Sequence, residues 1–149
     1  MQYLALFVPP GADPLPRETV DDPTIARYYV GFGSRSGDLG RVAESPAGTP
    51  IGAAGVRYST AADPSYGYVN DDTPELGIAV VDQDRGNGIG AAFLTALLAE
   101  LPRCSLSVDR RNLAMRLYER HGFSVLRREG DSVLMLHVRS DPAAVGSAR

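Results

Sequence analysis

Short apolar runs separated by turn-forming residues dominate the pattern of the chain, and helical periodicity appears in only a few places. Leu94, Leu97, Leu98 and Leu101 follow helical spacing, and Pro102 ends that predicted helix. Runs bounded by glycine, proline and aspartate predict six strands, at 39–44, 50–58, 75–81, 104–108, 123–127 and 132–138. The pattern therefore predicts a chain richer in strand than in helix.

Two other segments carry helix signals. Residues 112–120 have a helical spacing that turns Leu113, Leu117 and Tyr118 inward. Near the N-terminus, Asp22-Pro23 combines an acidic cap with a proline at the first helical position.

The order of these elements indicates one α+β domain. Hairpins lie before and after a central strand–helix–strand unit, whereas a doubly wound sheet needs repeated strand–helix units. The 149 residues suffice for about one domain, and neither an internal repeat nor a linker divides them. We expect a single domain over 1–139 and a flexible tail over 140–149. Residues 61–70 are predicted to be a loop, with room for a short strand at 66–69.

The composition excludes several kinds of site. All 15 basic residues are arginine, which excludes a catalytic or phosphate-binding lysine. The one cysteine, Cys104, and the two histidines, His121 and His137, argue against a metal site, and we expect none. A net charge of −3 argues against nucleic-acid binding. No apolar run approaches the ~20 residues of a membrane span and no signal peptide is recognised, so we expect a cytoplasmic protein.

The charges are unevenly divided between the two halves of the chain. Residues 1–75 contain ten acidic residues and five arginines, whereas residues 76–149 contain eight acidic residues and ten arginines. A basic C-terminal half suits an anionic small molecule, although solvated surface charges explain the same division.

The most informative segment is a glycine-rich turn within residues 80–91, between a predicted strand and a predicted helix. It contains Gly86, Gly88 and Gly90. Glycine lets the backbone approach a ligand closely, and free N–H groups at a helix start bind anions with the help of the helix dipole. The turn therefore predicts an anion site suited to a pyrophosphate.

Two other interpretations of this turn compete with that one. Gly86-x-Gly88-x-x-Ala91 matches a dinucleotide-binding fingerprint, with Asp109 placed as the ribose-binding acid. However, four polar residues separate the glycines from the strand, and the hairpins do not fit a doubly wound sheet. The second alternative is a turn that only packs tightly under a helix, for which three glycines in five residues are more than packing needs.

Two separate blocks of the chain match one known pattern. The first is the strand 75–81 followed by Arg85-x-x-Gly88-x-Gly90, and the second contains Leu106-Ser107-Val108-Asp109, then Asn112, Ala114 and Leu117-Tyr118-Glu119, then Gly122-Phe123. In their order and spacing the two blocks resemble the GCN5-related N-acetyltransferase (GNAT) superfamily, and jointly they are more specific than singly. The resemblance implies a three-layer α+β fold. Its sheet is mixed and mostly antiparallel, has helices on both faces, and is split near strands 75–81 and 104–108.

The resemblance implies an acetyl-CoA site made mainly of backbone groups. Backbone groups of Ile78, Ala79 and Val80 would pair with the pantetheine arm like an added strand. Asn112 would contact the cofactor, and backbone N–H groups of the turn would hold the pyrophosphate. The turn residues concerned are Arg85, Gly86, Asn87, Gly88, Ile89 and Gly90.

The resemblance also implies direct transfer of an acetyl group from acetyl-CoA to a primary amine, through a tetrahedral intermediate. Tyr118 would protonate or hydrogen-bond the leaving thiolate, with a core aromatic as the alternative. Glu75 is the candidate general base, with a water chain or a strand-end surface acid as alternatives. For the whole chain, the alternatives are a non-catalytic acyl-CoA-binding module of the same fold and a dinucleotide-binding domain.

The N-terminal part departs from the family pattern. No counterpart of the family's first strand is recognised, so we expect strand 39–44 to be an aggregation-prone or partner-covered sheet edge. The family's acceptor-binding region corresponds to 6–32, where acidic residues suit a cationic amine, although a solvated loop explains them equally well. The acceptor is expected to be a small-molecule or peptide amine of unspecified identity, and the family allows a homodimer.

Overall fold

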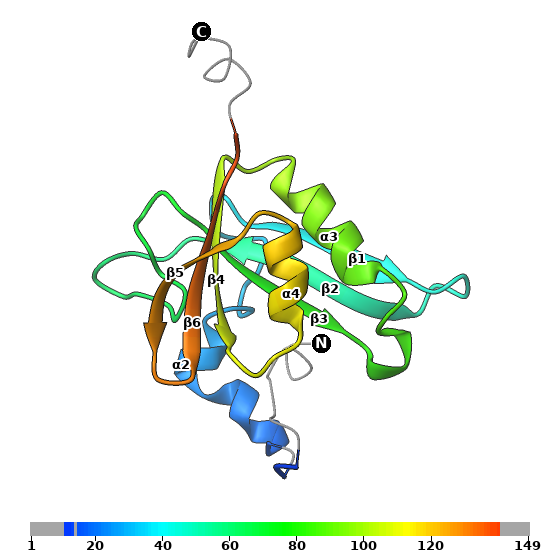
Figure 1. Cartoon of the computed structure of the whole chain (residues 1–149). Coiled ribbons are helices and arrows are strands. Elements are labelled where there is room, and N and C mark those ends of the chain that lie inside the picture. The colour runs from blue at the N-terminus through cyan, green and yellow to red at the C-terminus, as the bar shows by residue number, and fades with distance from the viewer. Residues whose placement is uncertain (1–10, 14, 141–149) are drawn as a thin grey trace, which may run out of the picture.

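A six-stranded sheet forms the centre of the computed structural model, which describes residues 11–13 and 15–140 (Figure 1). Within this part of the chain the strands lie in the order β1-β2-β3-β4-β6-β5. Their bounds are β1 (Leu39–Glu44), β2 (Pro50–Arg57), β3 (Glu75–Val80), β4 (Arg103–Asp109), β5 (Ser124–Glu129) and β6 (Ser132–Val138). Neighbouring strands are antiparallel except β3 and β4, which are parallel. The mixed, mostly antiparallel sheet confirms the predicted fold class.

Helical segments lie on both faces of this sheet. α3 (Ile89–Leu98) and α4 (Ala114–Arg120) cover one face (Figure 1). A 3₁₀ helix, η1 (Arg17–Asp21), and α2 (Pro23–Ala26) lead into a segment that packs on the other face, and a second 3₁₀ helix, η2 (Asp82–Asp84), follows β3. α2 begins as its sequence predicts, because the Asp22 side chain accepts a hydrogen bond from Thr24 N.

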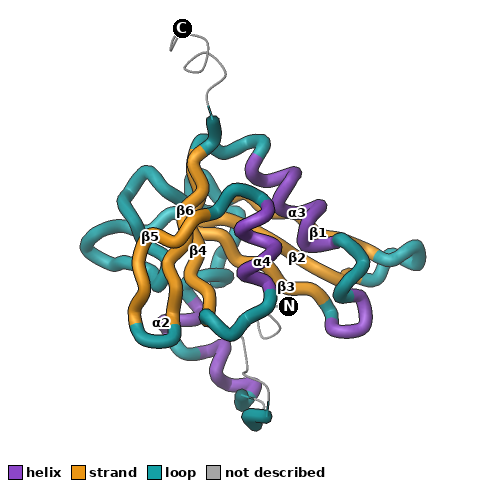
Figure 2. The backbone as a smooth tube through the Cα atoms, in the orientation of Figure 1, coloured by secondary structure: helices purple, strands orange, loops and turns teal. Residues whose placement is uncertain are grey.

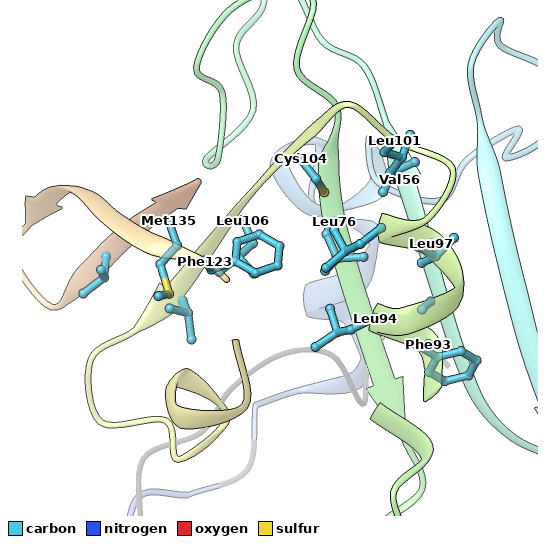
Figure 3. Close-up of a cluster of buried hydrophobic side chains, with 14 residues drawn as sticks. Val56, Leu76, Phe93, Leu94, Leu97, Leu101, Cys104, Leu106, Phe123 and Met135 are labelled. Atoms are coloured by element: carbon cyan, nitrogen blue, oxygen red, sulfur yellow. The ribbon is translucent and has the colours of Figure 1, made fainter. Parts of the chain in front are cut away.

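The hydrophobic core lies between the sheet and α3 (Figure 3). Leu94 and Leu97 of α3 are fully buried against Val56 of β2 and Leu76 of β3. Burial of one such leucine stabilises a protein by roughly 1.5–3 kcal/mol. Leu101 is also buried, although α3 already ends at Leu98, so the last leucine of the predicted helix packs from the following turn.

Two details of the predicted elements are wrong. Leu113, expected to face inward, is 78% exposed, because α4 begins only at Ala114 and Leu113 lies in the turn before it. No strand forms at 66–69. The backbone N–H groups of Tyr66 and Gly67 donate instead to the side chains of Tyr28 and Glu75, which removes the partners that a strand would need.

A buried ion pair fastens the N-terminal segment to the sheet. Arg57 of β2 binds both carboxylate oxygens of Asp38, at 3.0 and 2.8 Å, and the two side chains are 6% and 1% exposed. Its remaining nitrogen, Nη1, donates to the carbonyls of Arg27 and Val30. Because all of these groups are satisfied, the segment after α2 is held on the face of the sheet opposite α3.

Several expectations concern residues outside the described part. The predicted tail lies there except for Ser140, and so do residues 6–10 of the expected acceptor-binding region. Among the described residues, β1 pairs with β2 alone, and Val42 on it is 62% exposed. The aggregation-prone or partner-covered edge stays a prediction.

Candidate functional site

The sheet opens between its two parallel strands. Six residue pairs join β2 to β3 and seven join β4 to β6, but within the described residues only Glu75 and Ser105 pair β3 with β4. Beyond that pair the strands diverge, and α4 lies over the gap (Figure 2). The split predicted near 75–81 and 104–108 is confirmed.

Backbone groups of β3 line this split. Val81 N, just after β3, donates to Ile51 O of β2 at 2.9 Å. Since successive residues of a strand direct their N–H and C=O groups to alternate sides, those of Ala79 face β2, and those of Ile78 and Val80 face the split. An extended ligand could pair there like an added strand.

The turn between β3 and α3 presents free N–H groups. Gly86 (φ 80°) and Gly88 (φ 82°) have left-handed backbone, and a Cβ placed on either would meet nothing within 4 Å. Among the described residues, the N–H groups from Gly86 to Ala91 make no hydrogen bond, and the first helical bond runs from Ala92 N to Gly88 O. Free N–H groups at the positive end of the ten-residue α3 fit a pyrophosphate.

Arg85 and Asn112 both take part in local structure. The N–H of Arg85 donates to Asp82 O at 3.2 Å, and its guanidinium contacts Val80 O at 3.1 Å and the Asp82 carboxylate at 3.1 Å. Arg85 therefore braces the turn. Asn112 stabilises the turn before α4, because its Oδ1 accepts a hydrogen bond from Ala114 N at 2.9 Å. Its amide NH₂ group keeps two donors for a ligand.

Tyr118 lies on α4 and packs toward the core. Its ring meets Phe123 edge-on, with the centroids 5.9 Å apart. Burial raises the pKa of the Tyr118 phenol to about 12, so the hydroxyl stays protonated at neutral pH. Tyr118 is half-buried, and within the described part of the chain no hydrogen bond of its hydroxyl is found. The free hydroxyl is consistent with a role toward a ligand.

The contact between α4 and α3 depends on Gly90. A Cβ at this position would lie 3.0 Å from Cδ2 of Leu117. Gly90 therefore lets the helix that carries Tyr118 approach the first turn of α3. In this way the third glycine of the signature has a packing role.

Glu75 is a buried carboxylate at the closed end of the split. It is 7% exposed, and its Oε1 accepts hydrogen bonds from the Tyr28 hydroxyl at 3.1 Å and from Gly67 N at 2.9 Å. Its Oε2 is buried and makes no hydrogen bond with the described residues. Burial raises the pKa of Glu75, although its hydrogen bonds and the nearby charge of Arg27 act in the opposite direction. Because Glu75 is buried, the alternative interpretation of it as a surface acid at the end of a strand is wrong.

Two neighbouring cavities lie on the Glu75 side of the sheet. The smaller, of about 10 Å³, has room for one water molecule. It is lined by Glu75 together with Arg27, Tyr28, Arg35, Arg57, Tyr58, Ser59 and Ser65. The larger, of about 130 Å³, opens beside it and is lined by Thr24, Arg27, Pro64, Ser65 and Tyr66. Because the two cavities share Arg27 and Ser65, the larger one provides an approach toward the carboxylate.

Glu75 and Tyr118 belong to opposite faces of the sheet. Leu76, the neighbour of Glu75, packs in the core with the leucines of α3, so the Glu75 side chain points to the other face. Tyr118 packs against that same core from α4. The split between β3 and β4 is therefore flanked by a carboxylate on one side and a phenol on the other.

Three residues around Glu75 have no recognisable signal in the sequence. Tyr28 lies within the N-terminal region 6–32, far from Glu75 along the chain. Gly67 is required because a Cβ there would lie 2.5 Å from Oε1 of Glu75, and its carbonyl accepts a hydrogen bond from the buried Ser105 hydroxyl at 2.6 Å. These contacts join positions that are far apart along the chain, so no local pattern could reveal them.

The described residues contain neither a candidate metal site nor a membrane-spanning helix. No group of three or more histidine, cysteine, aspartate or glutamate side chains could hold a metal ion. No helix in that part of the chain is long and apolar enough to cross a membrane. Cys104 is buried, and burial raises the pKa of its thiol to about 12, which makes it unreactive.

Similarity to known proteins comes from structure. No family model matches the sequence, and no curated protein matches it. A protein from Bordetella pertussis assigned to the GNAT-family acetyltransferases is 26% identical, with a TM-score of 0.59 over 75% of this chain and 72% of that one. PaiA N-acetyltransferase from Thermoplasma acidophilum, in complex with coenzyme A, is 18% identical, with a TM-score of 0.61 over 82% and 74% of the two chains.

A GNAT superfamily phosphinothricin acetyltransferase from Sinorhizobium meliloti, in complex with AcCoA, is 20% identical, with a TM-score of 0.62 over 82% and 73% of the two chains. The chain therefore shares the fold of GNAT-family acetyltransferases.

Proposed function

We propose that this protein is an acetyl-CoA-dependent N-acetyltransferase whose acceptor is a primary amine on a small molecule or peptide. The observation that carries the proposal is the split in the sheet. Backbone groups of β3 face the split, free N–H groups lie at the start of α3, and a buried carboxylate with an unpaired oxygen lies at the closed end of the split.

The residues present fit acetyl-CoA. The N–H groups from Gly86 to Gly90 would hold the pyrophosphate, and the groups of Ile78 and Val80 that face the split would pair with the pantetheine arm. The Asn112 amide would add a side-chain donor. When bound, acetyl-CoA supplies a thioester, which is an activated acyl group.

Glu75 would serve as general base for the acceptor amine. An amine attacks only after losing a proton, and a carboxylate with a raised pKa is a stronger base than an ordinary glutamate. Since the cavity lined by Glu75 has room for one water, the proton would pass from the amine to the Glu75 carboxylate through that water. This arrangement combines the two alternatives of the sequence analysis, the carboxylate and the water chain.

Tyr118 would act on the opposite face of the sheet. With a pKa raised to about 12, its phenol is a hydrogen-bond donor at neutral pH and gives up its proton reluctantly. We therefore assign it the stabilisation of the departing sulfur through a hydrogen bond. The amine would reach the split from the Glu75 face and the thiolate would leave toward the Tyr118 face.

Two measurements test this function. Acetyl-CoA at about 100 times its Kd should stabilise the protein by ~2.7 kcal/mol, seen as a rise in Tm. A panel of amino acids, polyamines, aminoglycosides and peptides, with acetyl-CoA, should then release free thiol with at least one acceptor. Stabilisation by NAD and not by acetyl-CoA would show a dinucleotide site, and stabilisation by acetyl-CoA without thiol release from any amine would indicate the non-catalytic module.

A further inference from the structure

We propose that Tyr28 is a positioning residue for Glu75, with a hydroxyl that holds the carboxylate ionised in place and ties it to the loop that covers it. The inference rests on the proposed role of Glu75 as base. It adds a residue outside both blocks that resemble the GNAT signature.

The Tyr28 hydroxyl lies between two groups of different kinds. It donates to Oε1 of Glu75 at 3.1 Å and accepts from Tyr66 N at 2.9 Å. Burial, followed by the charge of Glu75, raises the pKa of Tyr28, so its phenol keeps the proton that it donates. The hydroxyl is thereby oriented, with its proton directed at the carboxylate.

Tyr28 works together with Gly67 on the same oxygen. Gly67 N donates to Oε1 at 2.9 Å, and the Gly67 carbonyl is fixed by Ser105 on β4. With Oε1 held by two donors, the carboxylate cannot rotate freely, and Oε2 is left without a hydrogen bond to the described residues. One oxygen is used for positioning, and the other is available to take a proton.

The charged groups around Glu75 do not replace the contribution of Tyr28. Arg57, its register partner on β2, is bound to Asp38, and Arg27 is bound to Asp63. Arg35 and Tyr58 line the cavity without an ion pair or hydrogen bond from the side chain to Glu75. On β4, the Cys104 thiol stays protonated, because burial and the charge of Glu75 raise its pKa. Tyr28 and Gly67 donate directly to Oε1. The Ser65 hydroxyl, which lines the same cavity, also acts as a donor that lowers the pKa of Glu75.

The test is Tyr28→Phe in the full chain. Removing a hydrogen bond to an ionised group should raise the pKa of Glu75 by about one unit. Two measurements report the pKa of Glu75: the acidic limb of kcat/KM against pH, and the ¹³C titration of the Glu75 carboxyl group without acetyl-CoA. Comparison with Glu75→Gln assigns the carboxyl signal. Both should move to higher pH, while the Kd for acetyl-CoA stays unchanged.

The matched control is Tyr68→Phe. It also removes a tyrosine–carboxylate hydrogen bond, the 2.5 Å contact from Tyr68 to Asp71 on the protein surface. Both Glu75 readouts should stay as in the parent protein. If Tyr28→Phe fails to fold, all seven tyrosines can be replaced with 3-fluorotyrosine, which makes the opposite change. A more acidic phenol is a better hydrogen-bond donor, so the pKa of Glu75 should fall.

The two readouts separate the two ideas. An unmoved carboxyl titration in Tyr28→Phe would overturn the positioning role, whatever happens to the rate. A uniform fall in rate with an unmoved titration would likewise overturn it, because it would mean that Tyr28 only packs. A moved titration with an unmoved acidic limb would support the Tyr28–Glu75 contact and overturn the assignment of Glu75 as base.

Discussion

The two sides of the split differ in the groups that line them: backbone groups on one side and side chains on the other. On the side of α3, the candidate cofactor site consists of backbone N–H and C=O groups exposed by glycines and by the separation of β3 from β4. On the other side, the candidate acceptor site consists of side chains, with Glu75 held by Tyr28 and by the loop at Gly67. The first kind of site depends on chain conformation, and the second depends on the chemical identity of each residue.

This difference has a consequence for variants. A backbone site should tolerate changes that keep the glycine conformation and leave the space open, and it should fail when bulk or charge enters. A side-chain site should fail on the loss of a single oxygen or proton, even when the shape is kept. The following predictions test that contrast, beginning with the largest expected effect.

Glu75→Gln should lower turnover through the acceptor side of the split and leave acetyl-CoA binding unchanged. Loss of a general base lowers kcat by about 10²- to 10⁴-fold, whereas the Kd for acetyl-CoA should not change. Stopped-flow thiol release and calorimetry measure the two quantities. Glu44→Gln, on the exposed end of β1, is the matched control and should keep the parent rate. An unchanged kcat in Glu75→Gln would show that Glu75 is not the general base.

Gly88→Glu should break the cofactor side. The added carboxylate would meet the phosphates, and like charges placed together cost several kcal/mol, which corresponds to a loss of at least about 100-fold in acetyl-CoA affinity. Gly48→Glu places the same side chain at the same φ of 82°, in the β1–β2 turn, and should bind acetyl-CoA normally. Equal affinity in the two variants would show that the turn does not hold the phosphates.

Tyr118→Phe should have a smaller effect, and mainly on turnover. The lost hydrogen bond to the departing sulfur is worth on the order of 1 kcal/mol, so kcat should fall about tenfold while the Kd for acetyl-CoA stays the same. Steady-state kinetics with the best acceptor would measure it. An unchanged kcat would assign Tyr118 to the core, where its ring packs on Phe123.

The smallest effect concerns stability and pH. Burial raises the pKa of Glu75, so the folded state binds its proton more tightly than the unfolded state does. The Glu75 contribution to stability is therefore full below the unfolded pKa and declines as pH rises through the folded pKa. Thermal melts should show this decline in the parent and not in Glu75→Gln, whose Tm at neutral pH should not be lower. A lower Tm for Glu75→Gln at neutral pH would mean that the ionised carboxylate stabilises the fold.

Much of the fold was predictable because the signals are local. The hairpin of β1 and β2, the central strand β3 and the final hairpin follow from alternating or continuous apolar runs with turns between them. The errors fall where tertiary contacts compete with pattern. Residues 66–69 have strand-like composition, but the N–H groups of Tyr66 and Gly67 donate to side chains. The apolar Leu113 lies in a turn, because α4 starts one residue later.

The sequence by itself determined the cofactor side. Gly86 and Gly88 after a strand specify left-handed backbone and free N–H groups at a helix start, and both features arise within a few residues. Only the tertiary structure decided the acceptor side. Tyr28, Gly67 and Glu75 meet because the N-terminal segment and the loop before β3 pack on one face of the sheet. The burial that raises the pKa of Glu75 comes from that packing, because desolvation depends on what surrounds a group in space.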